Sequence, residues 1–157
     1  MRRSDCYLLK DLKPFMKIIP YIMEKRSDSQ NFSKQTFPAE SIDRYIAEKK
    51  QSGYSFSYMH VFIAAYVRLI TERPQLNRFV INNQIYQRNK IYVSMAVKRS
   101  LRDEGEETTV KFEFTGKENI FDIAEIIDKN IAKVLSYNES TDTDKLAEMV
   151  MSMPGFV

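Results

Sequence analysis

Residues 56–98 read FSYMHVFIAAYVRLITERPQLNRFVINNQIYQRNKIYVSMAVK, and the predictions for the remaining chain start from this stretch. Its first third repeats apolar residues at helical spacing, which predicts a helix from about Tyr58 to Glu72 that is apolar nearly all round and therefore buried. Ser57 is a suitable N-cap, and Pro74 ends the helix because it biases Arg73 away from the helical conformation. The repeating residues are Met59, Phe62, Ile63, Tyr66, Val67 and Ile70.

The rest of this stretch has the period of β-strands. The turn residues Asn82 and Asn83 separate two short apolar runs, 79–81 and 84–86, and Asn tolerates the positive φ angles that a two-residue hairpin turn requires. Apolar residues then alternate with other residues from Ile91 to Lys98, which is typical of a strand with one apolar face. We therefore predict a hairpin, a further strand and a sheet that packs beside the helix.

The flanking sequence continues the alternation of helices and strands. Asn119 is a suitable N-cap for a helix with a continuous apolar face, and Gly53 is a suitable C-terminal cap for an earlier surface helix. The order of elements predicts an α/β fold in one domain, residues 1–157, with a mixed sheet and helices 58–72 and 120–135 on one face. The other predicted elements are helices at 15–23, 39–51 and 144–152 and strands at 31–37 and 110–115.

Composition limits the class of protein. The chain has 157 residues, 43% of them hydrophobic, which is enough for a core, and no apolar run approaches the roughly 20 residues that cross a bilayer. Its first residues lack the apolar block of a secretory signal, so we expect a cytoplasmic protein that does not enter a membrane. Cys6 and His60 are the only cysteine and the only histidine, which excludes an intramolecular disulfide and a Cys/His metal site. We predict no metal.

Charge is distributed in two opposite blocks. Residues 68–102 carry a local balance of +7, and residues 103–128 carry a balance of −7, although the whole chain has a net charge of only +3. The two blocks could compensate each other within the fold, or the basic block could face a ligand that bears phosphate. The sequence leaves both interpretations open.

No common catalytic signature is present. The chain has no glycine-rich phosphate loop, no Gly-x-Ser-x-Gly elbow and no His-Glu-x-x-His pair. His60 shares a helical stripe with Ala64, Arg68 and Thr71, which could face a cleft or a partner subunit, while the alternative is a histidine that is hydrogen-bonded at the margin of the core. Aromatic residues beside basic ones, as at Arg78-Phe79, fall on a hairpin whose apolar residues have a core to fill, which argues against nucleic-acid binding.

The central stretch resembles a known family. Residues 73–79, RPQLNRF, are preceded by a helix and followed by Asn83-Gln84-Ile85-Tyr86 and an Ile-x-Val-x-x-Ala-Val strand. This order resembles the catalytic domain of the dihydrolipoyl acyltransferases of 2-oxoacid dehydrogenase complexes and the related chloramphenicol acetyltransferases. The flanking elements are collinear with that superfamily over nearly the whole chain. The resemblance implies a two-layer α/β sandwich that assembles as trimers, and transfer of an acyl group from a coenzyme A thioester as substrate rather than as a tightly bound cofactor.

The resemblance does not supply a catalytic residue. In the family, the histidine of a His-x-x-x-Asp-Gly motif is the general base and a Ser or Thr hydroxyl stabilises the oxyanion. This sequence has no such motif, and His60 does not match it, so we assign no catalytic residue and expect the N-terminal part of the family fold. The chain would then need a C-terminal partner segment or act as a non-catalytic oligomerisation module. By resemblance, the wall of the acyl-acceptor pocket would involve Tyr21, Arg26 and Phe32.

Overall fold

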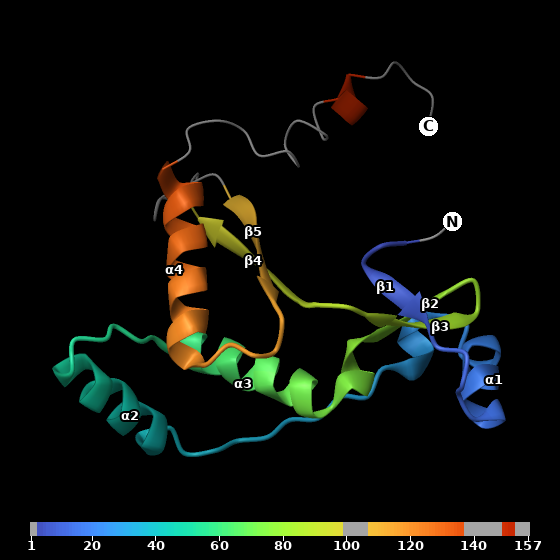
Figure 1. Ribbon diagram of the computed structural model, residues 1–157, viewed down its shortest axis with the longest axis horizontal. Helices are drawn as coiled ribbons and strands as arrows, with labels where there is room; N and C mark the ends of the chain where they lie inside the picture. Colours follow the sequence, from blue (N-terminus) through green and yellow to red (C-terminus); the bar gives the residue numbers. More distant parts are fainter. Residues whose placement is uncertain (1–2, 99–106, 137–148, 153–157) are drawn as a thin grey trace. The chain divides into compact units, whose positions relative to one another are not determined.

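The computed structural model describes residues 3–98, 107–136 and 149–152, and in these ranges the chain is α/β (Figure 1). The chain is divided into two compact units, one formed by Met1–Tyr92 with Glu113–Ala124 and the other by Val93–Phe112 with Glu125–Val157. The elements in chain order are β1 (Cys6–Leu8), α1 (Pro14–Ile22), the 3-10 turn η1 (Arg26–Ser29), α2 (Glu40–Gln51), α3 (Tyr58–Glu72), the 3-10 turn η2 (Pro74–Asn77), β2 (Arg78–Ile81), β3 (Gln84–Arg88), β4 (Ile91–Lys98), β5 (Glu107–Phe114) and α4 (Ile120–Ser136).

The predicted hairpin forms the centre of a three-stranded sheet. Strands β2 and β3 pair antiparallel around Asn82 and Asn83, whose φ angles are 47° and 58°, so the turn has the positive φ values that the sequence predicts. Strand β1 pairs with the other side of β3, which gives the order β1-β3-β2. The sequence did not predict β1, because three residues are too short to show a period and only β3 makes them a strand.

The second sheet consists of β4 and β5. The alternation predicted for β5 is confirmed, because Thr108, Val110, Phe112 and Phe114 are buried while the residues between them are exposed. The prediction of one mixed sheet differs from the structure, in which the described strands form two small sheets. In the first sheet all pairing is antiparallel.

The N-terminus of α4 is capped as the sequence predicts. The Asn119 side-chain oxygen accepts hydrogen bonds from the backbone N–H groups of Phe121 (2.8 Å) and Asp122 (3.1 Å), and the Asp122 carboxylate accepts one from the N–H of Asn119 (3.0 Å). This reciprocal arrangement is a capping box, and it satisfies amide groups that have no partner within the helix. The buried side chains of α4 are Ile123, Ala124 and Ile127.

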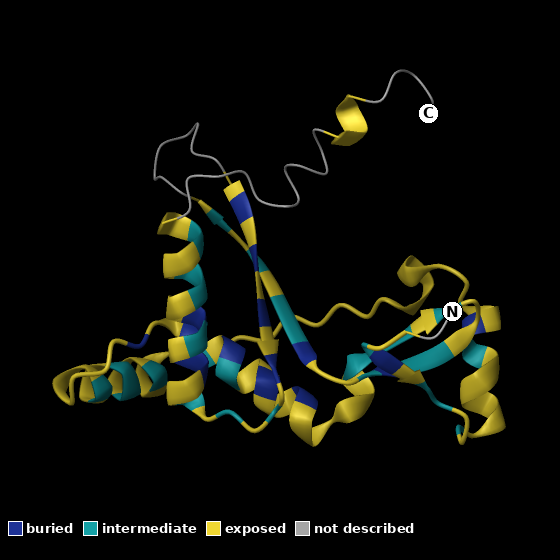
Figure 2. Ribbon diagram, turned by 45° about the horizontal axis from the view of Figure 1, so that its top comes forward, coloured by how far each residue is buried: buried dark blue, intermediate teal, exposed yellow. Residues whose placement is uncertain are grey.

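Helix α3 has the predicted bounds but only one buried face (Figure 2). Its buried residues are His60, Ile63, Val67 and Ile70, which lie one helical turn apart. The prediction that Phe62 is buried is wrong, because its side chain is 51% exposed. Tyr66 and Leu69 continue the same exposed row. An apolar composition all round a helix does not by itself reveal which side the fold covers.

Two other predicted elements differ from the structure or fall outside it. Residues 31–37 form no strand, and every side chain in this segment is exposed, because no other strand pairs with it. The predicted helix at 144–152 lies mostly outside the described residues, since the description resumes at Met149. The helix of 39–51 is confirmed as α2, and Gly53 follows it with a φ of +88°.

Candidate functional site

A pocket of about 400 Å³ lies in the first unit, beside the three-stranded sheet. It combines four apolar side chains with two lysines, a tyrosine and two side-chain amides, all from three nearby segments of the chain. The lining residues are Leu8, Leu9, Lys10, Leu12, Lys17, Tyr21, Asn83, Gln84 and Ile85. The size is that of many small-molecule sites, and the mixture of an apolar surface with a few polar groups is typical of them.

Local structure brings these segments together. The pairing of β1 with β3 extends to Leu9, whose N–H donates to the carbonyl oxygen of Ile85 at 3.0 Å, so the end of β1 and the start of β3 are held side by side. The left-handed turn at Asn82 and Asn83 places Gln84 at the same end of the sheet. Helix α1 begins at Pro14, which fits the first helical turn because its missing N–H has no partner there, and it contacts β3.

One of the three residues predicted for substrate binding lines this pocket. Tyr21 lies in the last turn of α1 and contributes to the lining. Arg26 begins η1, a few residues after the helix, and is not part of the lining. Phe32 is also outside the pocket, and its side chain is 89% exposed. The pocket therefore contains one of the three residues, and Arg26 and Phe32 are not among its lining.

Sequence reasoning missed the two lysines and the two amides of the pocket. Lys10 and Lys17 lie on either side of the start of α1, and the sequence indicates Asn83 as a turn residue and as part of the Asn83-Gln84-Ile85-Tyr86 resemblance, not as a pocket residue. A basic residue before a short helix and another within it can line one pocket only when the helix folds back on a hairpin. The sequence does not reveal that arrangement, because it depends on contacts between α1 and β3.

The pocket presents several polar side chains to a ligand. Its lining contains no histidine, cysteine, aspartate or glutamate, and its ionisable side chains are those of two lysines and a tyrosine. The lysines and the Tyr21 hydroxyl can donate hydrogen bonds, while the amides of Asn83 and Gln84 can donate and accept. The Gln84 side-chain oxygen already accepts a hydrogen bond from the Tyr86 hydroxyl at 3.1 Å.

His60 has a structural role at the start of α3. Its Nδ1 accepts a hydrogen bond from the backbone N–H of Ser57 at 3.1 Å, the place that a glutamate takes in a capping box. The side chain is 4% exposed and its ring lies edge-on to Phe56, with 6.3 Å between the centroids. Of its helical stripe, Arg68 and Thr71 are exposed while His60 is not. These contacts favour the interpretation of a histidine at the margin of the core.

A cluster of charged residues outside the pocket links the start of the chain to the three-stranded sheet. Asp5 accepts hydrogen bonds from Arg3 at 2.6 Å and from Arg88 at 3.4 Å, and the Arg88 guanidinium lies 4.5 Å from the centre of the Phe79 ring. The hydrogen bonds from Arg3 hold the pKa of the Asp5 carboxyl well below its usual range. Cys6 begins β1 and is buried, and burial raises the pKa of its thiol. The cluster is a structural tie, because both guanidinium groups contact the Asp5 carboxylate and the Phe79 ring.

The two charge blocks meet in the structure. Lys90 pairs with Glu113, and Lys98 lies 3.6 Å from Glu107, so basic residues from the ends of β4 face acidic residues of β5. Lys90 has a raised pKa, because Glu113 accepts its hydrogen bond. These two pairs support compensation within the fold as the interpretation of the blocks, although part of the basic block, Arg99 to Arg102, lies outside the described residues.

Within residues 3–98, 107–136 and 149–152, no group of three or more His, Cys, Asp or Glu residues is placed to hold a metal ion. No helix in those ranges has the length and apolar character needed to span a bilayer. Comparisons of the chain with family models, curated proteins and solved structures find no match.

Proposed function

We propose that this chain is a coenzyme A-dependent acyltransferase-like protein that forms a wall of the acyl-acceptor pocket and does not carry the catalytic base. The observation that carries the proposal is the position of Tyr21, which lines a pocket between the last turn of α1 and the edge of a sheet. The resemblance in sequence assigns the acceptor wall to the end of the first helix and to the first strand, and Tyr21 lies at the end of the first helix. The order of α1, α2, α3, the hairpin, β4 and α4 supports the same interpretation, whereas residues 31–37, which correspond to the family's first strand, form no strand here.

The proposal predicts that the chain alone does not transfer acyl groups. It has no His-x-x-x-Asp-Gly motif, and His60 is buried and caps α3. A missing general base and a missing oxyanion donor each cost on the order of a hundredfold or more in rate. Transfer from acetyl-coenzyme A to dihydrolipoate should therefore be undetectable with the purified chain and measurable after addition of a polypeptide that carries the family's His-x-x-x-Asp-Gly segment.

Two outcomes would contradict this proposal. One is turnover by the chain alone that His60→Ala abolishes while the variant stays folded, because the base would then be present. The other is formation of a complex with the added segment without any transfer. That second result would favour a non-catalytic oligomerisation module of the same fold, which is the alternative function.

A specific observation supports this alternative. Helix α1 buries only Pro20, and the exposed apolar side chains on it are mostly large. These side chains, and separately the exposed row on α3, are apolar surfaces of the kind that marks contacts with other proteins. The exposed large apolar residues of α1 are Phe15, Met16, Ile18, Tyr21 and Ile22.

A further inference from the structure

We propose that the pocket beside α1 binds a small ligand that joins an apolar body to one anionic group, a carboxylate or a phosphate. The inference names the ligand class of the proposed acceptor pocket and in that sense rests on the proposed function. Its basis, however, is the chemistry of the lining residues. Binding can therefore be measured without coenzyme A and without transfer.

The apolar half of the ligand follows from one part of the lining. Leu8, Leu9, Leu12 and Ile85 are each partly shielded from solvent and contribute aliphatic side chains. An alkyl or aromatic group placed against them would remove apolar surface from water on both partners. The volume of about 400 Å³ accommodates a molecule larger than a bare inorganic ion.

The anionic half follows from the two lysines. Lys10 and Lys17 both line the pocket, and no acidic side chain does. Within the described part of the chain neither lysine forms an ion pair, whereas Lys90 and Lys98 each face a glutamate. Two like charges at one small pocket repel each other, and an anion between them would relieve that repulsion. The Tyr21 hydroxyl adds a neutral donor from the same helix as Lys17.

The geometry also orients the ligand. Lys10 follows β1, whereas Lys17 and Tyr21 belong to α1, so the donors come from two different segments. Asn83 and Gln84 border the pocket at the hairpin turn and can bond to a polar substituent of the body.

The test is a titration of the full chain, without coenzyme A, by isothermal calorimetry and by amide chemical-shift mapping. The probes are hexanoate, hexyl phosphate, hexanol and acetate. Hexanoate or hexyl phosphate should bind and change the amide chemical shifts of Leu9, Tyr21 and Ile85. The probe that binds more tightly identifies the anionic group. Hexanol, which lacks the charge, and acetate, which lacks the apolar body, should each bind at least about fivefold more weakly.

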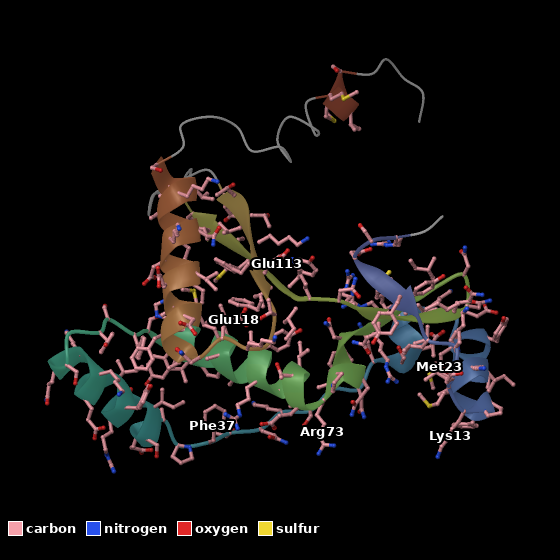
Figure 3. All side chains as sticks on the ribbon, in the orientation of Figure 1. Lys13, Met23, Phe37, Arg73, Glu113 and Glu118 are labelled. Carbon is pink, nitrogen blue, oxygen red and sulfur yellow. The ribbon has the colours of Figure 1, made fainter. Side chains whose placement is uncertain are left out.

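Matched variants separate this site from general charge effects. Lys10→Gln and Lys17→Gln should each weaken binding of the better probe about fivefold, because each removes one charge at an exposed position. Lys13→Gln is the control, since Lys13, at the start of α1 (Figure 3), falls between them in the sequence and is not among the lining residues of the pocket. Binding of hexanol as tight as that of the charged probes, equal effects of all three variants, or no binding of any probe would overturn the inference.

These results are distinguishable from failure of the proposed function. Binding that depends on Lys10 and Lys17, without transfer when the base-bearing segment is added, would support the proposed ligand class and contradict the proposed acyltransferase function. Transfer with that segment, without binding of hexanoate or hexyl phosphate, would support the acyltransferase function and contradict the proposed ligand class.

Discussion

Gly116 occupies a position that no other residue can take without strain. Its φ angle is +87°, and a Cβ atom there would lie 2.6 Å from the Thr71 side-chain oxygen, which itself donates a hydrogen bond to the Val67 carbonyl at 2.8 Å. Gly53 has a nearly identical φ of +88° but open space around it. The two glycines therefore separate the cost of the backbone conformation from the cost of the contact.

We expect Gly116→Ala to destabilise the chain by about 2–4 kcal/mol and Gly53→Ala by about 1 kcal/mol. The difference arises because only Gly116 meets a neighbour, and the β-branched Thr71 is stiff. In the double variant Gly116→Ala with Thr71→Ala, most of that difference should disappear. Free energies of unfolding from urea titration measure all three changes, and equal losses at the two glycines would show that the contact with Thr71 is not close.

Glu118 makes a pH-dependent contribution to the stability of the folded chain. Its carboxylate accepts hydrogen bonds from the N–H and the hydroxyl of Thr115 and from the N–H of Gly116, each at 2.8 Å. Burial alone would raise the pKa of Glu118, but these hydrogen bonds to the charged form outweigh burial and lower the pKa below its ordinary value of 4.5. The resulting stabilisation is complete above the unfolded pKa and is lost as the pH falls through the lower, folded pKa.

We expect Glu118→Gln to cost about 1 kcal/mol at pH 7, a small value because solvent screens much of the charge. A glutamine at this position retains one acceptor oxygen but points an amide donor at one of the N–H groups. The difference from the unsubstituted chain should shrink as the pH falls below 4.5, which urea titrations at several pH values can follow. Glu125→Gln is the control, because Glu125 is an exposed residue of α4. A loss of stability at pH 7 that is as small for Glu118→Gln as for the control would contradict a stabilising role of the Glu118 carboxylate.

At the scale of elements, helix α3 has one buried face and one exposed face, and mutations on the two faces can be compared. Ile63 is 8% exposed and Phe62 next to it is 51% exposed, although both are apolar and both repeat at helical spacing. Phe62 does contact Phe37, with 6.4 Å between the ring centroids, so its side chain is not without partners. Truncating the buried Ile63 side chain should therefore lower the free energy of unfolding more than truncating the exposed Phe62 side chain.

We expect Ile63→Ala to destabilise the chain by about 2–5 kcal/mol and Phe62→Ala by about 1 kcal/mol, at concentrations where the chain is monomeric. The larger value reflects a cavity at a packed position, whereas the smaller one reflects a single aromatic contact. Chemical denaturation followed by circular dichroism measures both. A larger loss for Phe62→Ala than for Ile63→Ala would mean that the row with Phe62 is the packed side of α3.

At the scale of the whole molecule, the exposed apolar side chains of α1 and α3 predict association. Large apolar side chains in a row on a helix surface favour contact with another protein surface, because contact removes them from water. We expect light scattering to give a mass above the 18.5 kDa of one chain at micromolar concentration. The combined change Phe62→Glu with Tyr66→Glu should shift the mass toward 18.5 kDa, while Lys50→Glu on exposed α2 should not. A monodisperse monomer for the unsubstituted chain at all concentrations would exclude this surface as an interface.

Much of the local structure is readable from the sequence. The bounds of α3 follow from Ser57 and Pro74, the hairpin from Asn82 and Asn83, and the cap of α4 from Asn119, because each depends on residues a few positions away. The α/β class and the exposed and buried faces of β5 follow from periodicity in the same way. Association, the single domain and acyl transfer remain predictions.

Only the tertiary structure decides which apolar faces are covered and which distant residues meet. Strand β1 exists through its pairing with β3, Phe62 is exposed although its period matches that of Ile63, and the pocket joins Lys10 and Tyr21 to Asn83. Of the three predicted pocket residues, Tyr21 reaches the lining while Arg26 and Phe32 do not. The physical reason is that periodicity and turn chemistry are set by neighbours in the chain. Burial and pocket formation instead depend on contacts between segments far apart in the sequence, and the residues of one segment do not encode these contacts.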